Sequence, residues 1–448
     1  MSDKDQETKQ PEAKQPEAKQ PKEKQPETKK SEAKPPATKD AGNNADPNFK
    51  KIKHPLTGEL AKKKSRKKRI IILVIILLLV VAACSGVAVY FLVFKKPVEH
   101  AATPEPEKQP EAPKIYSKLS GLEIADESEN KAPIYCVQTP NGADGARPQV
   151  GLNEAPVVFE AIAEAGITRF AAIYQNPKSK AIGPIRSLRS YYFDWDYPFD
   201  CIVVHAGGAP SAIAALNQSG YRHLNESAVY MWRDYSSYYA PNNLFTSAEK
   251  LDAFDKSMGY TSSDAKTLPR LTPEEAKKIA SDNVDASKET NDEGEESKVV
   301  PLVSNIRVNF GGVSTFNTVY TYNEETNTYA RAYASGEQHL VYNCANTDKS
   351  EPAPKSDCGT AIQIAPSAIA VMMVDERRDT DGYHEVIQTI GNGNAYIFQN
   401  GTAIKGLWKK TSQSAQIEFT DTEGNTISFT PGQLWIAAIS NSVGNVQY

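Results

Sequence analysis

An uncharged apolar run, Ile70–Phe94, constrains this 448-residue chain more than any other feature of its sequence. At about 1.5 Å of rise per residue, a helix of this length reaches about 37 Å and can cross a hydrocarbon core of roughly 30 Å. Seven of the eight residues in Lys62–Arg69 are basic, whereas only Lys95 and Lys96 follow the run. Because positive charge stays on the cytoplasmic side, we predict a single-pass protein of the cell membrane with a cytoplasmic N-terminus and extracellular C-terminal domains. The basic cluster is also expected to bind anionic membrane lipid.

Cys84 offers an alternative anchor. The small residues Val81-Ala82-Ala83 before it resemble the cleavage sequence of a bacterial lipoprotein, and cleavage there would leave a lipid anchored at Cys84. Against this alternative, the charged region before the run is much longer than that of an ordinary signal peptide. The apolar run also continues past Cys84 to Phe94. The uncleaved transmembrane helix is therefore preferred.

The segments on either side of the span have the composition of unfolded chain. Residues 1–69 contain four consecutive five-residue repeats over Lys9–Thr28, each with a proline, before the basic juxtamembrane cluster. Such a segment buries too little apolar surface to offset its chain entropy, which predicts a disordered cytoplasmic tail. Residues 95–114 are proline-rich and predict an extended stalk.

The extracellular part is expected to be α+β, in two successive domains. Residues 115–260 mix strand and helix patterns, including a hairpin at Ala165-Gly166 and a strand–turn–helix unit from Cys201 to Asn217. Residues 300–448 contain many short alternating runs separated by turn signals, which predicts a β-rich domain. Residues 261–299 form an acidic linker or insertion, in which Thr272-Pro273 predicts a helix that ends near Ala280.

The cysteines outside the span predict disulfides, because an extracellular compartment permits them. Cys344 and Cys358 flank a polar loop, and Cys136 and Cys201 lie on two predicted strands. We predict the pairs 344–358 and 136–201, with four free thiols as the alternative. The absence of a CxxC sequence argues against a zinc site of thiolates.

Two short segments suggest a binding pocket. Arg186 and Arg189 follow Gly183-Pro184, and arginine forks match the oxygens of a carboxylate or phosphate. At His205 a predicted strand ends, two glycines follow, and a helix begins whose free amides would favour an anion. Together with an arginine in a glycine-rich loop, these segments predict a pocket for an anionic or polar ligand. The candidate ligand-binding residues are Arg147, Arg186, Ser187, Arg189, His205, Gly207 and Gly208.

Structural roles are the alternative for the same residues. Arg186 and Arg189 would then pair with nearby carboxylates, and His205 would be a satisfied core histidine. The nearby carboxylates are those of Glu160, Glu164, Asp194 and Asp196.

Enzyme signatures are mostly missing from the sequence. GxSxG, HExxH and Walker sequences are absent, and the histidines lack the spacing of metal ligands. We therefore predict no cofactor and no metal, and leave open whether the protein is an enzyme. The extracellular part also lacks the basic stripe that nucleic-acid binding needs.

Several of these segments resemble the YerB-like family of bacterial extracytoplasmic proteins. The first region matches in Ala146-Arg147-Pro148-Gln149-Val150-Gly151-Leu152, Ala163-Glu164-Ala165-Gly166-Ile167-Thr168-Arg169-Phe170, Ile182-Gly183-Pro184-Ile185-Arg186-Ser187-Leu188-Arg189 and Val204-His205-Ala206-Gly207-Gly208. The second region matches in Gly391-Asn392-Gly393-Asn394-Ala395, Gly406-Leu407-Trp408-Lys409 and Pro431-Gly432-Gln433-Leu434-Trp435. The resemblance implies two successive domains of unassigned function and, since members are often described as lipoproteins, an outer-surface location.

The leading functional hypothesis is a membrane-anchored binding or scaffold protein of the bacterial cell envelope with an anion-binding pocket. Its partner would be a cell-wall polymer or an envelope protein. One alternative is an enzyme of envelope carbohydrate or phosphate chemistry that uses His205 as acid or base. Another is a protein–protein interaction module.

Overall fold

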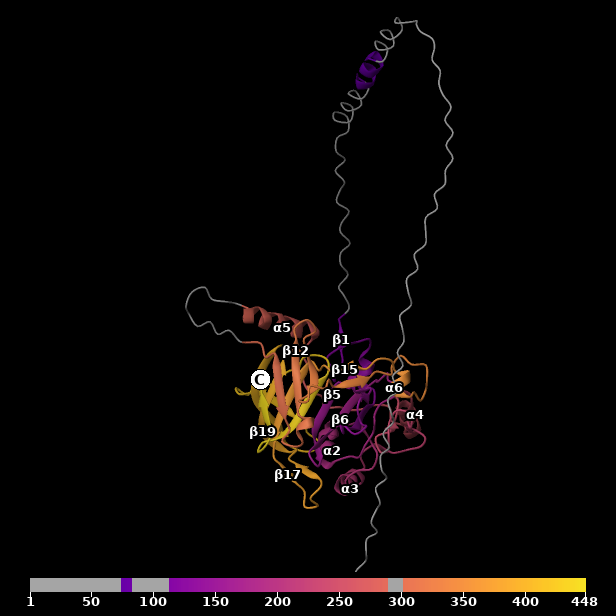
Figure 1. The fold of residues 1–448 in the computed structure, drawn as a ribbon, viewed down its shortest axis with the longest axis vertical. Helices are drawn as coiled ribbons and strands as arrows, with labels where there is room; N and C mark the ends of the chain where they lie inside the picture. Colours follow the sequence, from indigo (N-terminus) through magenta and orange to yellow (C-terminus); the bar gives the residue numbers. More distant parts are fainter. Residues whose placement is uncertain (1–73, 83–112, 289–300) are drawn as a thin grey trace, which may run out of the picture. The chain divides into compact units, whose positions relative to one another are not determined.

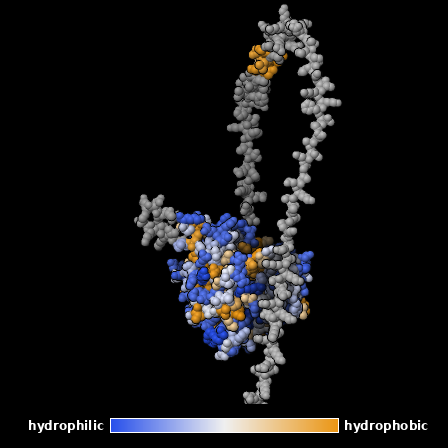
Figure 2. Space-filling view, in the orientation of Figure 1, coloured by the Kyte–Doolittle hydropathy of each residue, from blue (hydrophilic) through white to orange (hydrophobic). Residues whose placement is uncertain are grey.

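The computed structural model describes residues 74–82, 113–288 and 301–448 (Figure 1). Residues 74–82 form a helix of wholly hydrophobic residues (Figure 2). The rest of the predicted span with Cys84, the predicted disordered tail, nearly all of the stalk and the end of the acidic linker lie outside the described ranges. Among the residues described, no helix is both long and apolar enough to cross a membrane. The chain divides into two units, Met1–Glu107 and Lys108–Tyr448, and the sheets described below belong to the second.

One ten-stranded sheet runs through both predicted extracellular domains. Its order is β21-β20-β19-β16-β22-β5-β6-β3-β7-β8. The two halves of the chain meet where β22 pairs in parallel with β5, from Leu434 opposite Val157 to Ala437 opposite Glu160. These strands are β3 (Ile134–Pro140), β5 (Val157–Glu164), β6 (Ile167–Gln175), β7 (Ile202–His205), β8 (His223–Asn225), β16 (Ala368–Val374), β19 (Gly391–Gln399), β20 (Thr402–Lys410), β21 (Glu418–Asp421) and β22 (Leu434–Ser440).

Local turn chemistry produces the predicted hairpin at Ala165-Gly166 and a second hairpin at one of the turn signals of the β-rich region. Ala165-Gly166 joins β5 to β6 with φ of 50° and 78°, and Asn400-Gly401 joins β19 to β20 with φ of 52° and 73°. Two consecutive residues with positive φ match the twist of the strands that they join, and Asn and Gly reach this conformation at little cost.

Smaller sheets cover or extend the central one. A four-stranded sheet has the order β13-β12-β11-β23, and a three-stranded sheet, β15-β14-β4, joins the two halves a second time. The strands are β4 (Gln149–Val150), β11 (Asn305–Asn309), β12 (Thr318–Asn323), β13 (Thr328–Tyr333), β14 (Leu340–Tyr342), β15 (Ile362–Gln363) and β23 (Asn445–Gln447). Three two-stranded pairs are β1 (Ile115–Tyr116) with β2 (Glu123–Ile124), β9 (Trp232–Arg233) with β10 (Leu244–Phe245), and β17 (Glu376–Arg378) with β18 (Glu385–Ile387). The fold is thus a strand-rich mixture of strands and helices.

The helices begin and end at residues that suit these positions. α3 has proline at its first position and ends at Gly220, whose φ is 64°. The α-helices are α2 (Ser190–Asp196), α3 (Pro210–Ser219), α4 (Ala248–Met258), α5 (Pro273–Lys288) and α6 (Pro354–Asp357). The 3₁₀ turns are η1 (Glu127–Lys131), η2 (Leu152–Glu154), η3 (Tyr197–Phe199) and η4 (Ser314–Phe316).

α5 begins where the sequence predicts but runs two turns further. Thr272 and Glu275 exchange hydrogen bonds at its start, which is a capping box. The predicted end near Ala280 is wrong because an ion pair between Lys278 and Asp282 and a bond from Asn283 to the Asn400 carbonyl extend the helix.

The core lies on both faces of the central sheet. On one face Phe159 packs with Trp195 of α2 and Leu216 of α3, and on the other Val158 packs with Ile306 of the four-stranded sheet. Both predicted disulfides are present: Cys136–Cys201 links β3 to the residue before β7, and Cys344–Cys358 closes the polar loop. The tertiary fold thus brings residues from both halves against a single sheet.

Candidate functional site

The predicted site residues lie in three separate places. Arg147 belongs to a buried polar network, and Arg189 lines a cavity beside α2 and α3. His205 lies at the end of β7 against another histidine. The three places differ in the burial and hydrogen-bond partners of these side chains, and each supports a different role.

Arg147 lies over an aromatic ring in the interior. Its guanidinium carbon is 3.5 Å from the centre of the Tyr333 ring. Its Nε donates to the backbone carbonyl of Asn141 at 3.0 Å and to the side-chain oxygen of the same residue at 3.1 Å. Arg147 is thus held by Asn141 of the first half and by the Tyr333 ring of the second half, apart from the contacts of Arg189 described below.

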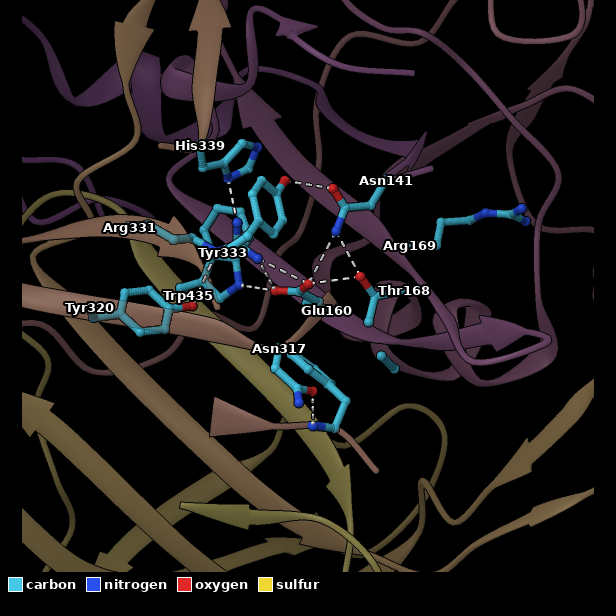
Figure 3. A network of polar contacts seen from close by, with 12 residues as sticks. Asn141, Glu160, Thr168, Arg169, Asn317, Tyr320, Arg331, Tyr333, His339 and Trp435 are labelled. Atoms are coloured by element: carbon cyan, nitrogen blue, oxygen red, sulfur yellow. Dashed lines mark hydrogen bonds and ion pairs between the residues drawn. The ribbon is translucent and has the colours of Figure 1, made fainter. Parts of the chain in front are cut away.

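The buried network is centred on an ion pair between Glu160 of β5 and Arg331 of β13 (Figure 3). Both side chains have 0% exposure, and two hydrogen bonds of 3.0 and 2.8 Å join them. The Trp435 indole donates to the same carboxylate at 2.8 Å, and the Thr168 hydroxyl donates at 2.9 Å. These donors satisfy the hydrogen-bonding capacity of the buried Glu160 carboxylate. Because Glu160 and Arg331 come from different halves of the chain, their ion pair joins the two halves of the fold.

His339 completes this network in its neutral form. Its Nδ1 accepts from the Arg331 guanidinium at 2.6 Å, so the proton is on Nε2, which donates to the Gln149 side-chain oxygen at 3.0 Å. Burial, together with the charge of Arg331, holds the pKa of His339 well below its ordinary value. Sequence reasoning assigned no role to His339 and missed Arg331, although Arg331 occupies an inward-facing position in the alternating strand β13.

A second carboxylate on β5, Glu164, faces the other side of the sheet. In the pairing of β5 with β6, Glu160 is opposite Phe170, and the next residue of β5, Ala161, is opposite Arg169. Paired residues point to the same face and consecutive residues to opposite faces, so Glu160 and Arg169 lie on different faces of the sheet. The register shifts between Ile162 and Glu164, which turns Glu164 toward Arg169. Figure 3 shows Arg169 directed away from the Glu160 network.

Glu164 is shared by more than one arginine. Its two oxygens accept from Arg169 and Arg189, each at 2.6 Å. Arg169 also donates to the backbone carbonyl of Ser187 at 2.6 Å, so Ser187 supports the cluster through its main chain. Arg186 lies close by: burial lowers the pKa of its guanidinium, Glu164 opposes this effect, and Arg189 adds to it. One of the alternatives, pairing of Arg189 with Glu164, is therefore observed.

The arginine cluster exceeds the capacity of its single carboxylate. Arg169 and Arg189 bind Glu164, and Arg186 interacts with it electrostatically without a hydrogen bond. The buried Nε atoms of these three arginines have no hydrogen-bond partner within the described part of the chain. Buried donors without acceptors destabilise the folded protein, so a negatively charged group bound beside these arginines would be favourable.

A cavity of about 510 Å³ lies directly beside the cluster. One wall carries Arg189, Ser190 at the start of α2 and Ser211 in the first turn of α3, and the two hydroxyls are 3.0 Å apart. The first-turn amides of α3 add the positive end of the helix dipole. The lining residues are Arg189, Ser190, Tyr191, Asp194, Ala209, Pro210, Ser211, Asp379, Asp381, His384, Glu385, Val386 and Ile387.

A second part of the lining comes from the hairpin of β17 and β18 and is rich in acidic residues. Asp381 pairs with the His384 ring at 2.6 Å, and this hydrogen bond lowers the pKa of Asp381 to about 2. Glu385 pairs with Arg378 at 2.7 Å. A backbone bridge between Glu164 and His384 fixes this hairpin against the arginine cluster. The cavity lining therefore combines hydroxyls, amides and Arg189 with the carboxylates of Asp194 of α2 and of the β17–β18 hairpin.

His205 does not line this cavity. Its Nδ1 donates to the Gly207 carbonyl at 2.8 Å, and its Nε2 accepts from His223 at 3.1 Å. Burial lowers the pKa of His205 to about 4. Because both ring nitrogens are engaged and the ring is buried, these contacts match the core-histidine interpretation.

The two glycines after His205 position the start of α3. Gly207 has φ of 64°. A Cβ on Gly208 would lie 2.8 Å from the Ile213 side chain. Gly208 forms a bridge with Leu188, which brings the start of α3 next to Arg189 and Ser190. Gly207 and Gly208 therefore contribute to the cavity by forming the turn that positions Ser211.

Comparison with known proteins gives the family. Residues 119–261 match the N-terminal domain of DUF3048, a protein family of unknown function, and residues 306–436 match its C-terminal domain. This chain belongs to the YerB-like DUF3048 family. It is 28% identical to "Putative lipoprotein YerB" of Bacillus subtilis (strain 168) over 330 residues, which are 72% of this chain and 86% of the relative.

A crystal structure of YerB from Bacillus subtilis has a similar fold. It matches with a TM-score of 0.57 at 23% identity and covers 75% of this chain and 100% of the YerB chain. The family resemblance inferred from sequence motifs is thus confirmed. Both DUF3048 domains contribute to the cavity: Ser190 and Ser211 come from the N-terminal domain, and Asp381 and His384 come from the C-terminal domain.

Proposed function

We propose that this DUF3048 protein is an extracytoplasmic binding protein of the bacterial envelope that takes a polar ligand with an anionic group into the cavity beside α2 and α3. Its N-terminal region holds it at the membrane, through the span Ile70–Phe94 or through a lipid at Cys84. The name of the Bacillus subtilis relative supports the lipid anchor. The two disulfides support an oxidising compartment outside the cytoplasm.

The observation that carries the proposal is the presence of both anion-binding groups and carboxylates in the lining of one cavity. Arg189, the Ser190 and Ser211 hydroxyls and the first-turn amides of α3 form a wall that suits a carboxylate or phosphate. The carboxylates of Asp379 and Asp381 suit hydroxyl or amino groups at the other end of the ligand. Fragments of acidic cell-wall polymers combine these groups, and we propose them as the ligand class.

A charge change at Ser211 tests the proposal without weakening the fold. Ser211→Asp adds a carboxylate in the first turn of α3, where the helix dipole favours it, so the protein should remain folded. The new charge repels an anionic ligand, and we expect affinity for acidic wall fragments to fall about ten-fold or more. Isothermal titration calorimetry of the full-length protein in detergent, with peptidoglycan fragments and glycerol-phosphate oligomers, measures the effect.

Ser211→Asn is the matched control, because it has nearly the same shape as aspartate but no charge. It should bind within about three-fold of the natural protein. If Ser211→Asp binds these fragments as tightly as Ser211→Asn does, the cavity is not the site.

A further inference from the structure

The loop between β9 and β10, residues 234–243, is held in one conformation by its own hydrogen bonds. Its base is closed by a bond of 2.8 Å from the Asp234 amide to the Asn243 carbonyl. The Asp234 carboxylate accepts from the amide and the hydroxyl of Ser236, at 2.8 and 2.6 Å, and from the amide of Ser237 at 3.2 Å. We call this segment the tyrosine loop.

One tyrosine anchors the loop to the rest of the fold. Tyr238 is 2% exposed, and its hydroxyl donates to the Pro148 carbonyl at 2.6 Å. Its ring packs against Phe245, with the ring centres 5.0 Å apart, in a small core that also contains Cys344. The loop is therefore fixed both internally and at its centre.

The tyrosines on either side of this anchor point outward. Tyr235 is 74% exposed and Tyr239 is 81% exposed. Within the described part of the chain, neither phenol makes a hydrogen bond and neither ring packs on another aromatic ring. These two large rings thus contribute little to the stability of the fold, and a braced loop holds them at the surface.

We propose that the tyrosine loop is a saccharide-binding surface, separate from the cavity. Tyrosine presents an apolar ring face with a polar hydroxyl at its edge, which matches the alternating C–H faces and hydroxyls of a sugar. The exposed Ser236 and the serine beside it add hydrogen-bonding groups around the rings. Because the loop is already ordered, binding would cost little conformational entropy.

The size of the surface favours a saccharide over a folded protein. A stable protein interface buries about 800 Å² on each partner, whereas a tyrosine contributes roughly 150–250 Å². The two exposed rings therefore match a few sugar units but fall short of a stable protein interface. The choice of a wall saccharide rests on the proposed envelope location, and the binding itself is independent of the cavity.

Short oligomers of N-acetylglucosamine, which are uncharged, are the probe for the full-length protein in detergent. We expect Tyr235→Ala/Tyr239→Ala to weaken their binding about ten-fold or more, measured by calorimetry. Tyr235→Phe/Tyr239→Phe keeps both rings and should retain binding within about three-fold. Val229→Ala is the control, since Val229 is 68% exposed, lies outside the tyrosine loop and carries no ring.

Each outcome bears on the proposal. It is overturned if the natural protein does not bind the oligomers, if the double alanine variant binds them equally well, or if the phenylalanine variant loses binding to the same degree. Loss of a protein partner with no effect on saccharide would indicate a protein-docking loop instead. Tyr235→Ala/Tyr239→Ala should leave the binding of glycerol-phosphate oligomers, which contain no sugar ring, unchanged, so a failure of the cavity proposal is distinguished from a failure here.

Discussion

Two carboxylates on the same strand of this protein have different surroundings. Glu160 is sealed in the interior with Arg331, Trp435 and Thr168, and its contacts are complete. Glu164 is shared between Arg169 and Arg189 beside a cavity, in a cluster with unpaired guanidinium donors. A buried ion pair with all its partners stabilises one arrangement of the chain, whereas a cluster with excess donors beside a cavity is suited to a ligand.

Removal of the charge at Glu160 should have the largest effect. Glu160→Gln leaves the Arg331 guanidinium buried without a counter-charge, and we expect the free energy of unfolding to fall by about 3–5 kcal/mol. Urea denaturation of the full-length protein in detergent measures it. Glu160→Gln/Arg331→Met removes both charges and should recover part of the loss. A single variant as stable as the natural protein would contradict the structural role of this pair.

Removal of the charge at Glu164 should have a smaller effect, and an anion should reverse it. Glu164→Gln leaves Arg169 and Arg189 unpaired beside a cavity that water and ions reach, so we expect a loss of about 1–3 kcal/mol. Inorganic phosphate should then raise the melting temperature of this variant, because binding to the folded state stabilises it. The same phosphate should leave Glu160→Gln unchanged, since that site is sealed. Equal responses of the two variants would break the comparison.

The pH dependence of stability separates the sealed network further. The pKa of His339 lies well below 6.5 in the folded protein, so below pH 6.5 the unfolded chain binds a proton that the folded chain does not. Stability should therefore fall as pH drops from 6.5 toward the folded pKa, by up to about 1.4 kcal/mol per pH unit for this residue. Urea denaturation at several pH values measures the slope.

His339→Gln provides the control for this slope, because glutamine does not titrate. The variant should have a shallower pH dependence than the natural protein. His205, whose pKa is about 4, contributes a slope of the same sign between pH 4 and 6.5, and His205→Asn isolates that contribution. Identical slopes in the natural protein and in both variants would refute the neutral form of these histidines.

The sequence alone determined the features that depend on neighbouring residues. The hairpins at Ala165-Gly166 and Asn400-Gly401 and the strand–turn–helix unit before Pro210 follow from spacing and turn chemistry. Such features need only a few residues, so their signals are complete within a short segment. The sequence named the cysteines that form disulfides but left their pairing open, and Cys136 and Cys201 are 65 residues apart.

Only the tertiary structure decided which distant groups meet. Glu160 and Arg331 are 171 residues apart in the chain, and nothing near either residue specifies the other. The parallel pairing of β5 with β22 merges two predicted domains into one sheet, and the shift at Ile162 turns Glu164 toward Arg169. These contacts depend on how whole elements pack, because long-range pairing is stabilised by the completed core and not by any local pattern.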